Sequence, residues 1–318
     1  MLKKIRHRIR YRNRPAYPLH RTDLRTLPTD YSGLIVTSDI DKTYLQTEFE
    51  SIRDLIRTAL EKAEDKKSIP GMKPLLRGFR HGPNPNPMEV PLYFVSASPP
   101  QMRNVLEEKI ALDGIRTDGL TFKNQLRLLR RGRLDQFRGH VLYKLTALLL
   151  NRTVRPLSAQ IEEVLIGDDT ETDADTYLLY AKILRGEMTL TQCKEKLVEL
   201  NATSSEQEKI LPLFQREDHS KVKRIYIHRT KGRPLDQFPA HDPTLFLAAS
   251  DSLQIAIDAW TNHWIREEDV LEVAKEFHGD ALLASIEEAR QRGLFSSEAL
   301  EHIQNLLKEQ ELLPTSSV

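Results

Sequence analysis

The sequence has 318 residues, which is enough for one large domain or two modest ones. Hydrophobic residues make up 39% of it and charged residues 29%, as in ordinary soluble proteins, and the formal net charge of +1 creates no overall field that would select a partner. The single cysteine excludes an intrachain disulfide, and the lack of a long apolar run argues against a transmembrane helix.

Residues 1–29 form a basic segment in which Asp23 is nearly the only acid. Its cations include Lys3, Lys4, Arg6, Arg8, Arg10, Arg12 and Arg14. The segment is either a solvated tail or an arm that contacts an anionic membrane surface. Nucleic acid would attract the same charges, but aromatic residues that could stack on bases are sparse. No apolar stretch follows the charges as in a secretory signal, so we expect a cytoplasmic protein that can lie at the periphery of a membrane.

The stretch 35–43 begins as an apolar strand and ends in Asp39, Asp41 and Thr43. Residues two apart on a strand point to the same side, so both carboxylates can reach one cavity just past the strand end. There one aspartate can attack an electrophile and help to hold a divalent cation, while the other passes a proton to the leaving group. An ordinary acidic turn has the same spacing, so the pattern by itself leaves both interpretations open.

Two connecting segments follow this strand. A helix is predicted over residues 49–64, because apolar residues recur there at helical spacing. Residues 80–91 contain four prolines and several polar residues, which predicts a surface loop before the next strand.

The second apolar strand covers residues 92–95 and ends at Ser96, followed by Ala97 and Ser98. A proline then opens a helix predicted over residues 101–112. A serine hydroxyl and the backbone N–H groups at such a junction can bind phosphate oxygens. A helix-capping serine is the alternative interpretation.

Residues 123–138 are basic again and directly precede Lys144, which opens an apolar helix. The basic residues are Lys123, Arg127, Arg130, Arg131, Arg133 and Arg138. They form either a solvated face or a contact for an anionic substrate or lipid surface. Lys144 can neutralise a phosphate and a nucleophilic aspartate, although a lysine in this position is by itself more often a solvated surface residue.

The third apolar strand, residues 164–166, ends in Gly167, Asp168 and Asp169, and Asp173 follows shortly after. Clustered carboxylates repel one another, so they either separate in solvent or share a hard cation such as Mg²⁺, which prefers oxygen ligands. Both a metal site and a solvated acidic loop are consistent with this segment.

The remaining chain is predicted to be helical over residues 176–216, with strands at 224–229 and 244–248 and helices between 251 and 312. His228 and Arg229 stand at the end of the first of these strands and could point toward the site or into solvent.

The order of these motifs resembles that of the haloacid-dehalogenase superfamily of phosphohydrolases, over most of residues 30–250. The chain is more closely similar to one branch, the phosphatidate phosphatase catalytic domain of the actin-patch-protein type. The matching motifs are Asp39-Ile40-Asp41-Lys42-Thr43, Tyr93-Phe94-Val95-Ser96-Ala97-Ser98-Pro99, Tyr143-Lys144-Leu145, and Gly167-Asp168-Asp169 with Asp173 and Tyr177. Lys42, Pro100, Tyr143 and Asp169 depart from the residues usual in this branch.

The resemblance implies a role for each matching residue. Asp39 would be the nucleophile that forms an aspartyl-phosphate, and Asp41 would protonate the leaving oxygen and then deprotonate the attacking water. Lys144 would stabilise negative charge. The substrate would be bound by Thr43, Ser96, Ala97 and Ser98. Mg²⁺ would be held by Asp39, the backbone carbonyl of Asp41 and Asp168, with Asp169 and Asp173 as further ligands or supports.

The implied fold is a three-layer α/β/α Rossmann-like domain with a parallel central sheet. The first two motifs lie close together in the sequence, so we expect no large cap and an open site. The expected organisation is a basic arm at 1–29, a phosphatase domain at 30–250 with a helical insertion at about 184–220, and a helical extension at 251–318.

The function expected from these features is Mg²⁺-dependent phosphomonoester hydrolysis through an aspartyl-phosphate, with phosphatidate or a related lipid phosphate as substrate. One alternative is a phosphatase for a soluble sugar phosphate, a nucleotide or a phosphorylated macromolecule. Another is a non-catalytic adaptor that binds anionic membranes through its basic residues.

Overall fold

The structure is a computed structural model, and it describes residues 19–28, 30–46, 63–98, 100–123, 141–153, 161–170, 172–214, 221–239 and 241–313. The basic residues at positions 3–14, nearly all of the helix predicted over 49–64 and the basic run from 124 onward lie outside these ranges. The predictions made for those segments, including the lack of a large cap, therefore stay predictions.

A seven-stranded sheet forms the centre of the described structure, in the order β1-β4-β3-β2-β5-β6-β7. The strands are β1 (Leu19–Asp23), β2 (Gly33–Asp39), β3 (Leu92–Ser96), β4 (Gly119–Lys123), β5 (Ile161–Asp168), β6 (Lys221–His228) and β7 (Phe246–Ala249). The edge strand β1 runs antiparallel to β4, and all other neighbours are parallel. The carboxyl ends of the parallel strands therefore meet at one edge, where such sheets bind ligands.

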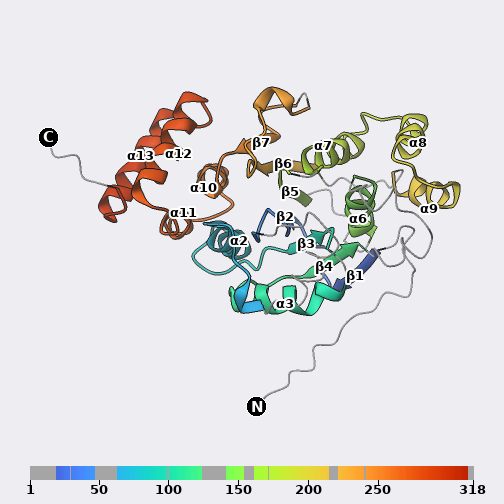
Figure 1. Cartoon of the computed structure of the whole chain (residues 1–318), viewed down its shortest axis with the longest axis horizontal. Helices are drawn as coiled ribbons and strands as arrows, with labels where there is room; N and C mark the ends of the chain where they lie inside the picture. The colour runs from blue at the N-terminus through green and yellow to red at the C-terminus, as the bar shows by residue number, and fades with distance from the viewer. Residues whose placement is uncertain are drawn as a thin grey trace, which may run out of the picture.

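Helices cover both faces of this sheet (Figure 1). They are α2 (Met72–His81), α3 (Arg103–Leu112), α6 (Val141–Thr153), α7 (Asp173–Leu184), α8 (Leu190–Glu199), α9 (Ser204–Phe214), α10 (Ser252–Thr261), α11 (Glu267–Ala274), α12 (Gly279–Gln291) and α13 (Ser297–Glu309), with short 3-10 turns at Ala63–Asp65, Pro100–Met102 and Leu235–Gln237. α2 and α10 lie on one face, and α6 and α7 on the other. The predicted Rossmann-like α/β fold is confirmed, and the sheet, predicted to be parallel, is parallel except at its β1 edge. Within the described ranges, no helix has the length and apolar character needed to cross a bilayer.

The central strands are apolar on both sides because both faces of the sheet are covered. In β5, Leu165 packs among α6 and α7, while Val164 and Ile166 pack on the side of α2 and α10. Such two-sided burial produces continuous apolar runs rather than alternation. The sheet register then sets Asp168 opposite His228 at the carboxyl edge.

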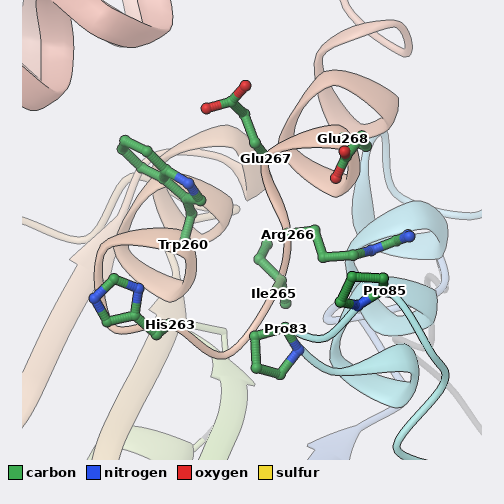
Figure 2. A pocket seen from close by; sticks show the side chains of 8 residues that line it. All are labelled: Pro83, Pro85, Trp260, His263, Ile265, Arg266, Glu267 and Glu268. Carbon is green, nitrogen blue, oxygen red and sulfur yellow. The ribbon is translucent and has the colours of Figure 1, made fainter.

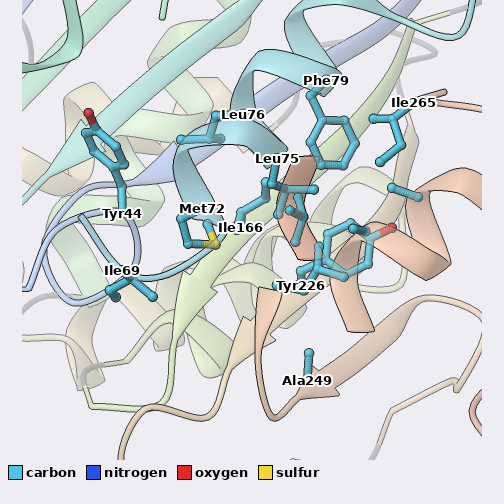
Figure 3. Packing of buried hydrophobic residues seen from close by; sticks show 14 of the residues in the cluster. Tyr44, Ile69, Met72, Leu75, Leu76, Phe79, Ile166, Tyr226, Ala249 and Ile265 are labelled. Carbon is cyan, nitrogen blue, oxygen red and sulfur yellow. The ribbon is translucent and has the colours of Figure 1, made fainter. Parts of the chain in front are cut away.

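The C-terminal helices share a core with α2. Figure 3 shows side chains of α2 packed together with Tyr226 of β6 and with Ile265, which precedes α11. Two glycines permit this approach. A Cβ on Gly71, whose φ is 73°, would lie 2.1 Å from the Ser252 hydroxyl oxygen, and one on Gly78 would lie 2.8 Å from the Cβ of Asp269. The predicted helical extension thus packs directly on the sheet domain.

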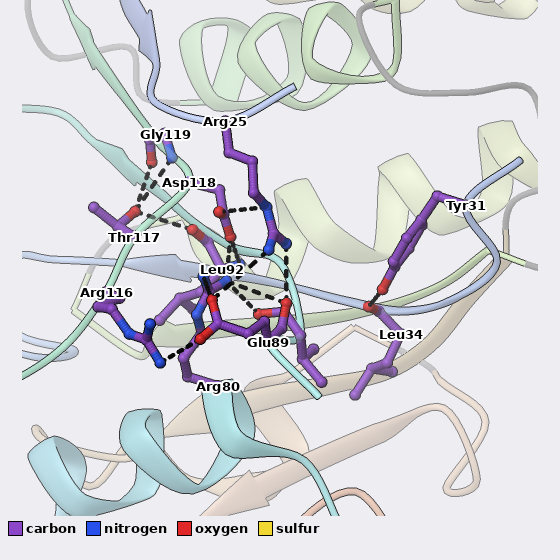
Figure 4. A network of polar contacts seen from close by, with 11 residues as sticks. Arg25, Tyr31, Leu34, Arg80, Glu89, Leu92, Arg116, Thr117, Asp118 and Gly119 are labelled. Atoms are coloured by element: carbon purple, nitrogen blue, oxygen red, sulfur yellow. Dashed lines mark hydrogen bonds and ion pairs between the residues drawn. The ribbon is translucent and has the colours of Figure 1, made fainter. Parts of the chain in front are cut away.

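A buried ion-pair network clamps the opposite, amino-terminal edge of β3 and β4 (Figure 4). Asp118, which is 2% exposed, accepts a hydrogen bond from the backbone N–H of Leu92 at 2.9 Å. It also pairs with Arg80 of α2 and, at 2.8 Å, with Arg25. Two guanidinium groups balance the buried charge of this carboxylate. The network therefore holds the starts of β3 and β4 together and has a structural role.

Most predicted elements agree with the structure, with two differences. The helix predicted over 176–216 is three helices, because Gly186 adopts a left-handed φ of 69° and Thr189 starts α8 with a capping box. The helix α2 and the strands β1 and β4 were not predicted. β1 lies within the segment interpreted as a basic arm, and five-residue strands carry too little periodicity to be recognised.

Candidate active site

The chain turns tightly after β2 and keeps three polar side chains at the carboxyl edge of the sheet. Asp39 is the last residue of β2, and Asp41 and Thr43 follow it; all three are buried. Two backbone N–H groups farther along donate to the carbonyl of Ile40 at 3.0 and 2.9 Å. Lys42 adopts a left-handed φ of 60°, which costs a non-glycine residue about 1–2 kcal/mol. The turn thus directs Asp41 and Thr43 back over the strand end.

Three carboxylates and one ammonium group meet at this edge. Asp39, Asp168 and Asp173 each offer an oxygen, and these oxygens lie within 4.8 Å of one another. The Lys144 Nζ lies 3.2 Å from Asp39 Oδ1 and also pairs with Asp173 Oδ1. All four side chains are at most 1% exposed. We call these four residues the acidic cluster.

Gly167 is required for the position of Asp173. A Cβ at Gly167 would lie 2.4 Å from Asp173 Oδ2, which no side chain could tolerate. Without it, Asp173 at the start of α7 reaches back and accepts a hydrogen bond from the Asp168 backbone N–H at 3.2 Å. Burial, together with the Asp173 carboxylate, raises the pKa of the nearby Tyr177, whose hydroxyl therefore stays protonated.

Asp168 is oriented by hydroxyl and backbone donors. The Thr43 hydroxyl donates to Asp168 Oδ2 at 3.3 Å, which links the turn after β2 to the end of β5. The Thr170 backbone N–H donates to the other oxygen at 2.5 Å, and the Thr170 hydroxyl does so as well. Thr170 was not predicted as a site residue, although a hydroxyl two residues after a strand-end aspartate is a local sign of such a turn.

Asp41, which is not one of the three clustered carboxylates, is held by two serines. The hydroxyls of Ser96 and Ser98 donate to the same oxygen, Asp41 Oδ2, at 2.7 and 2.8 Å. The Ser98 backbone N–H donates to the Ser96 hydroxyl oxygen at 3.0 Å, and Ala97 between them is buried. The end of β3 therefore orients a carboxylate that approaches from β2, a contact that sequence reasoning did not predict.

The acidic cluster has the donor atoms and the charge that suit a divalent cation. Three carboxylates and one ammonium group lie together in a fully buried place, so negative groups outnumber positive ones among these four residues. Carboxylates that share a buried site repel one another. Carboxylate oxygens are the ligands that hard cations prefer. The cluster could therefore hold a metal ion.

Asp169 is not among the three clustered carboxylates. Its carboxylate accepts hydrogen bonds from the Thr230 hydroxyl at 3.1 Å and from the backbone N–H groups of Lys231 and Arg233 at 2.9 and 2.7 Å. All three donors belong to the loop that follows β6. Asp169 was predicted to support the metal. Its contacts favour another role, in which its carboxylate anchors the loop after β6.

The two residues at the end of β6 differ in their surroundings. Burial lowers the pKa of His228 to about 4, although the Asp169 carboxylate opposes that shift, so its ring is neutral at pH 7. Arg229 turns toward the C-terminal helices, where it pairs with Glu288 of α12 at 3.3 Å and donates to the Ser250 hydroxyl at 3.4 Å. Arg229 is therefore engaged outside the acidic cluster.

A cavity of about 410 Å³ lies elsewhere, between the loop after α2 and the segment joining α10 to α11 (Figure 2). Its lining residues are Pro83, Pro85, Trp260, His263, Ile265, Arg266, Glu267 and Glu268. None of them belongs to the acidic cluster. Two of its charged side chains have partners within the protein, since Arg266 pairs with Asp269 at 2.7 Å and Glu267 contacts His302 at 2.6 Å.

Replacement of the two neighbouring aspartates should separate metal binding from loop anchoring. We expect MgCl₂ to raise the melting temperature of the wild type and of Asp169→Ala, because the acidic cluster is intact in both. Asp168→Ala should lose that shift, since one of three clustered carboxylates is gone. Thermal denaturation with and without MgCl₂ measures this. Loss of the shift in both variants would instead make Asp169 part of the metal site.

A comparison with family models identifies the part of the chain that carries this site. Residues 34–191 match the family described as phosphatidate phosphatase APP1, catalytic domain. This segment is an APP1-type catalytic domain. The match runs from β2 to the start of α8 and includes all four residues of the acidic cluster. Membership of this family indicates that the protein is a phosphatase enzyme. No curated protein and no solved structure matches the chain.

The APP1-type match covers about half of the chain. β6, β7 and α9 to α13 lie outside it, although β6 and β7 complete the sheet on which the catalytic segment is built. The loop after β6 that Asp169 anchors is also outside the matched segment. The placement in the haloacid-dehalogenase superfamily stays a prediction.

Proposed function

We propose that this phosphatase hydrolyses phosphatidate or a related lipid phosphate by an Mg²⁺-dependent mechanism with an aspartyl-phosphate intermediate. The observation that carries the proposal is the acidic cluster of Asp39, Lys144, Asp168 and Asp173 at the carboxyl edge of an APP1-type catalytic domain. A cytoplasmic enzyme of this kind would reach its lipid substrate from the aqueous side of a membrane.

Asp39 is the nucleophile in this mechanism. Its carboxylate oxygen attacks phosphorus, the bond to the lipid oxygen breaks, and the phosphoryl group is transferred to Asp39. A carboxylate needs no base to activate it at pH 7, because its reference pKa is about 3.9. The ammonium group of Lys144, 3.2 Å from Asp39 Oδ1, stabilises the negative charge on the transferring phosphoryl group.

The three clustered aspartates would hold Mg²⁺, which supplies positive charge beside the phosphoryl oxygens. Asp173 fixes Lys144 by an ion pair and Asp168 by a backbone hydrogen bond. Thr43 orients Asp168 through its hydroxyl. Lys144 and Asp168 are thus each held by a neighbouring residue at the same edge of the sheet. Because these groups are already in position, the site needs little rearrangement during the reaction.

Asp41 is the general acid and base. Ser96 and Ser98 donate to Oδ2, so the proton would be carried on the other oxygen, Oδ1. It would be given to the leaving lipid oxygen and then taken back from the water that hydrolyses the aspartyl-phosphate. Ser96, Ala97 and Ser98 would also line the space for the phosphoryl group, beside the Asp41 carboxylate that the two serines hold.

The experiment is phosphate release from phosphatidate in mixed micelles, beside a panel of soluble phosphomonoesters, with MgCl₂ or with a chelator. We expect release from phosphatidate that disappears with the chelator and returns with excess Mg²⁺. Release from soluble esters alone would keep the mechanism and contradict the lipid assignment. Release that persists in the chelator would contradict the metal requirement.

A further inference from the structure

The chain leaves β6 through a cationic loop beside the acidic cluster. We call residues 229–235 the β6 loop; its sequence is Arg-Thr-Lys-Gly-Arg-Pro-Leu. His228, the last residue of β6, lies opposite Asp168 in the sheet, and the Asp169 backbone N–H donates to the His228 carbonyl at 3.1 Å. The loop therefore starts at the same edge as the proposed active site, although it lies outside the family match at 34–191.

The β6 loop is held in one conformation. The Asp169 carboxylate accepts one hydrogen bond from the Thr230 hydroxyl and two from the backbone N–H groups of Lys231 and Arg233. Gly232 adopts a left-handed φ of 67°, which completes the turn, and no atom lies within 4 Å of the place a Cβ would take. A loop fixed in this way binds a partner without a large cost in conformational entropy.

The two arginines of the β6 loop are used within the protein. Arg229 pairs with Glu288, and its Nε donates to the Arg233 carbonyl at 3.0 Å. The Arg233 guanidinium stacks over the Phe238 ring, 4.6 Å from its centroid. These contacts hold both arginine side chains against the protein. The exposed surface of the loop is therefore formed by its other residues.

Two residues of the loop face outward. Lys231 is exposed and forms no ion pair with any residue that the structure describes. Leu235 is 44% exposed, whereas most leucines in the described ranges are buried. A cation and an exposed apolar side chain on one rigid loop is the combination that binds a lipid interface, where the cation meets acidic headgroups and the apolar group enters the acyl boundary.

We propose that the β6 loop docks the enzyme on the anionic lipid surface that contains its substrate, with Lys231 at the headgroups and Leu235 in the acyl boundary. The inference rests on the proposed lipid substrate. A lipid phosphate must reach the buried Asp39 while its acyl chains stay in the membrane, so the protein surface next to the site has to lie against the bilayer. The β6 loop has the place and the charge for that contact.

The test compares two double variants of the full chain that lose the same groups at opposite ends of the sheet. Lys231→Gln with Leu235→Ser changes the β6 loop. Lys221→Gln with Leu112→Ser is the matched control, because Lys221 begins β6 at its amino end and Leu112, 56% exposed, ends α3. Each pair removes one exposed positive charge and one exposed leucine.

Sedimentation with phosphatidylcholine vesicles that contain phosphatidylserine measures surface binding without occupying the active site. One lysine near acidic lipid contributes about a fivefold change in binding, and one inserted leucine about a tenfold change. We therefore expect the loop variant to bind about 50-fold more weakly than the wild type and the control variant to bind like the wild type. Both variants should hydrolyse a soluble short-chain phosphatidate with unchanged kcat and KM.

Two results would overturn the proposal. The first is equal vesicle binding by the loop and control variants. The second is a KM for soluble short-chain phosphatidate that rises in the loop variant as much as vesicle binding falls, which would make the loop a contact for single substrate molecules. Sedimentation does not depend on turnover, so the two tests are independent. If the wild type hydrolyses no phosphatidate, the proposed function is refuted, and the vesicle result still tests the role of the loop.

Discussion

Asp39→Asn should abolish phosphate release, with a loss of about 10⁴-fold or more. The amide has nearly the shape of the carboxylate but cannot attack phosphorus and form an aspartyl-phosphate. The substitution also removes one of three clustered negative charges. We therefore expect Asp39→Asn to fold and to be at least as stable as the wild type, so that the lost activity reports on the function of this carboxylate and not on unfolding.

The measurement is the initial rate of phosphate release on the best substrate, together with thermal denaturation of both proteins. Asp39→Ala is a useful second variant, because it cannot revert to aspartate by deamidation. Activity within tenfold of the wild type in both variants would assign the nucleophile to another residue. A large loss of thermal stability would contradict this expectation and would show that the Asp39 carboxylate stabilises the fold.

Lys144→Met should lower the free energy of unfolding by about 3–5 kcal/mol, because it removes a buried cation from beside the carboxylates of Asp39 and Asp173. Methionine fills a similar volume, so the loss comes mainly from charge. Adding Asp39→Asn to Lys144→Met should recover about 1–3 kcal/mol, since one of the two carboxylates is then neutral. Activity should fall about 10²–10³-fold, as expected for the loss of one transition-state donor.

Urea unfolding of the wild type, both single variants and the double variant measures this coupling. Lys182→Met is the matched control, because Lys182 is exposed on α7 and its substitution should change stability by about 0.5 kcal/mol or less. Additive effects of Lys144→Met and Asp39→Asn would contradict a direct electrostatic interaction between the two residues.

The location of most active-site candidates could be predicted from the sequence. Asp39 and Asp168 follow apolar strands of a chain that alternates strands and helices, and carboxyl ends of parallel strands meet at one edge. Lys144 lies near the start of α6, and Asp173 begins α7, so both helices enter the sheet layers from that edge. A residue at a strand end or a helix start can be located from the apolar pattern of the short segment around it, together with the order of the elements.

The direction of several side chains depends instead on residues that are distant in the sequence. Asp169 has the same strand-end position as Asp168, yet its carboxylate binds a loop 61 to 64 residues away. Asp41 is held by serines 55 and 57 residues farther along. A carboxylate turns toward the best donors that folding brings near it, and these donors are not encoded beside it.

The C-terminal helices show the same division. Their apolar spacing predicts helices over residues 251–312, and the structure contains them. Their packing against α2 follows from Gly71 and Gly78, which lie far upstream and allow a close approach of backbones that larger residues would prevent. Helix formation is largely a local property, whereas the packing partner of a helix is set by shape complementarity between distant segments.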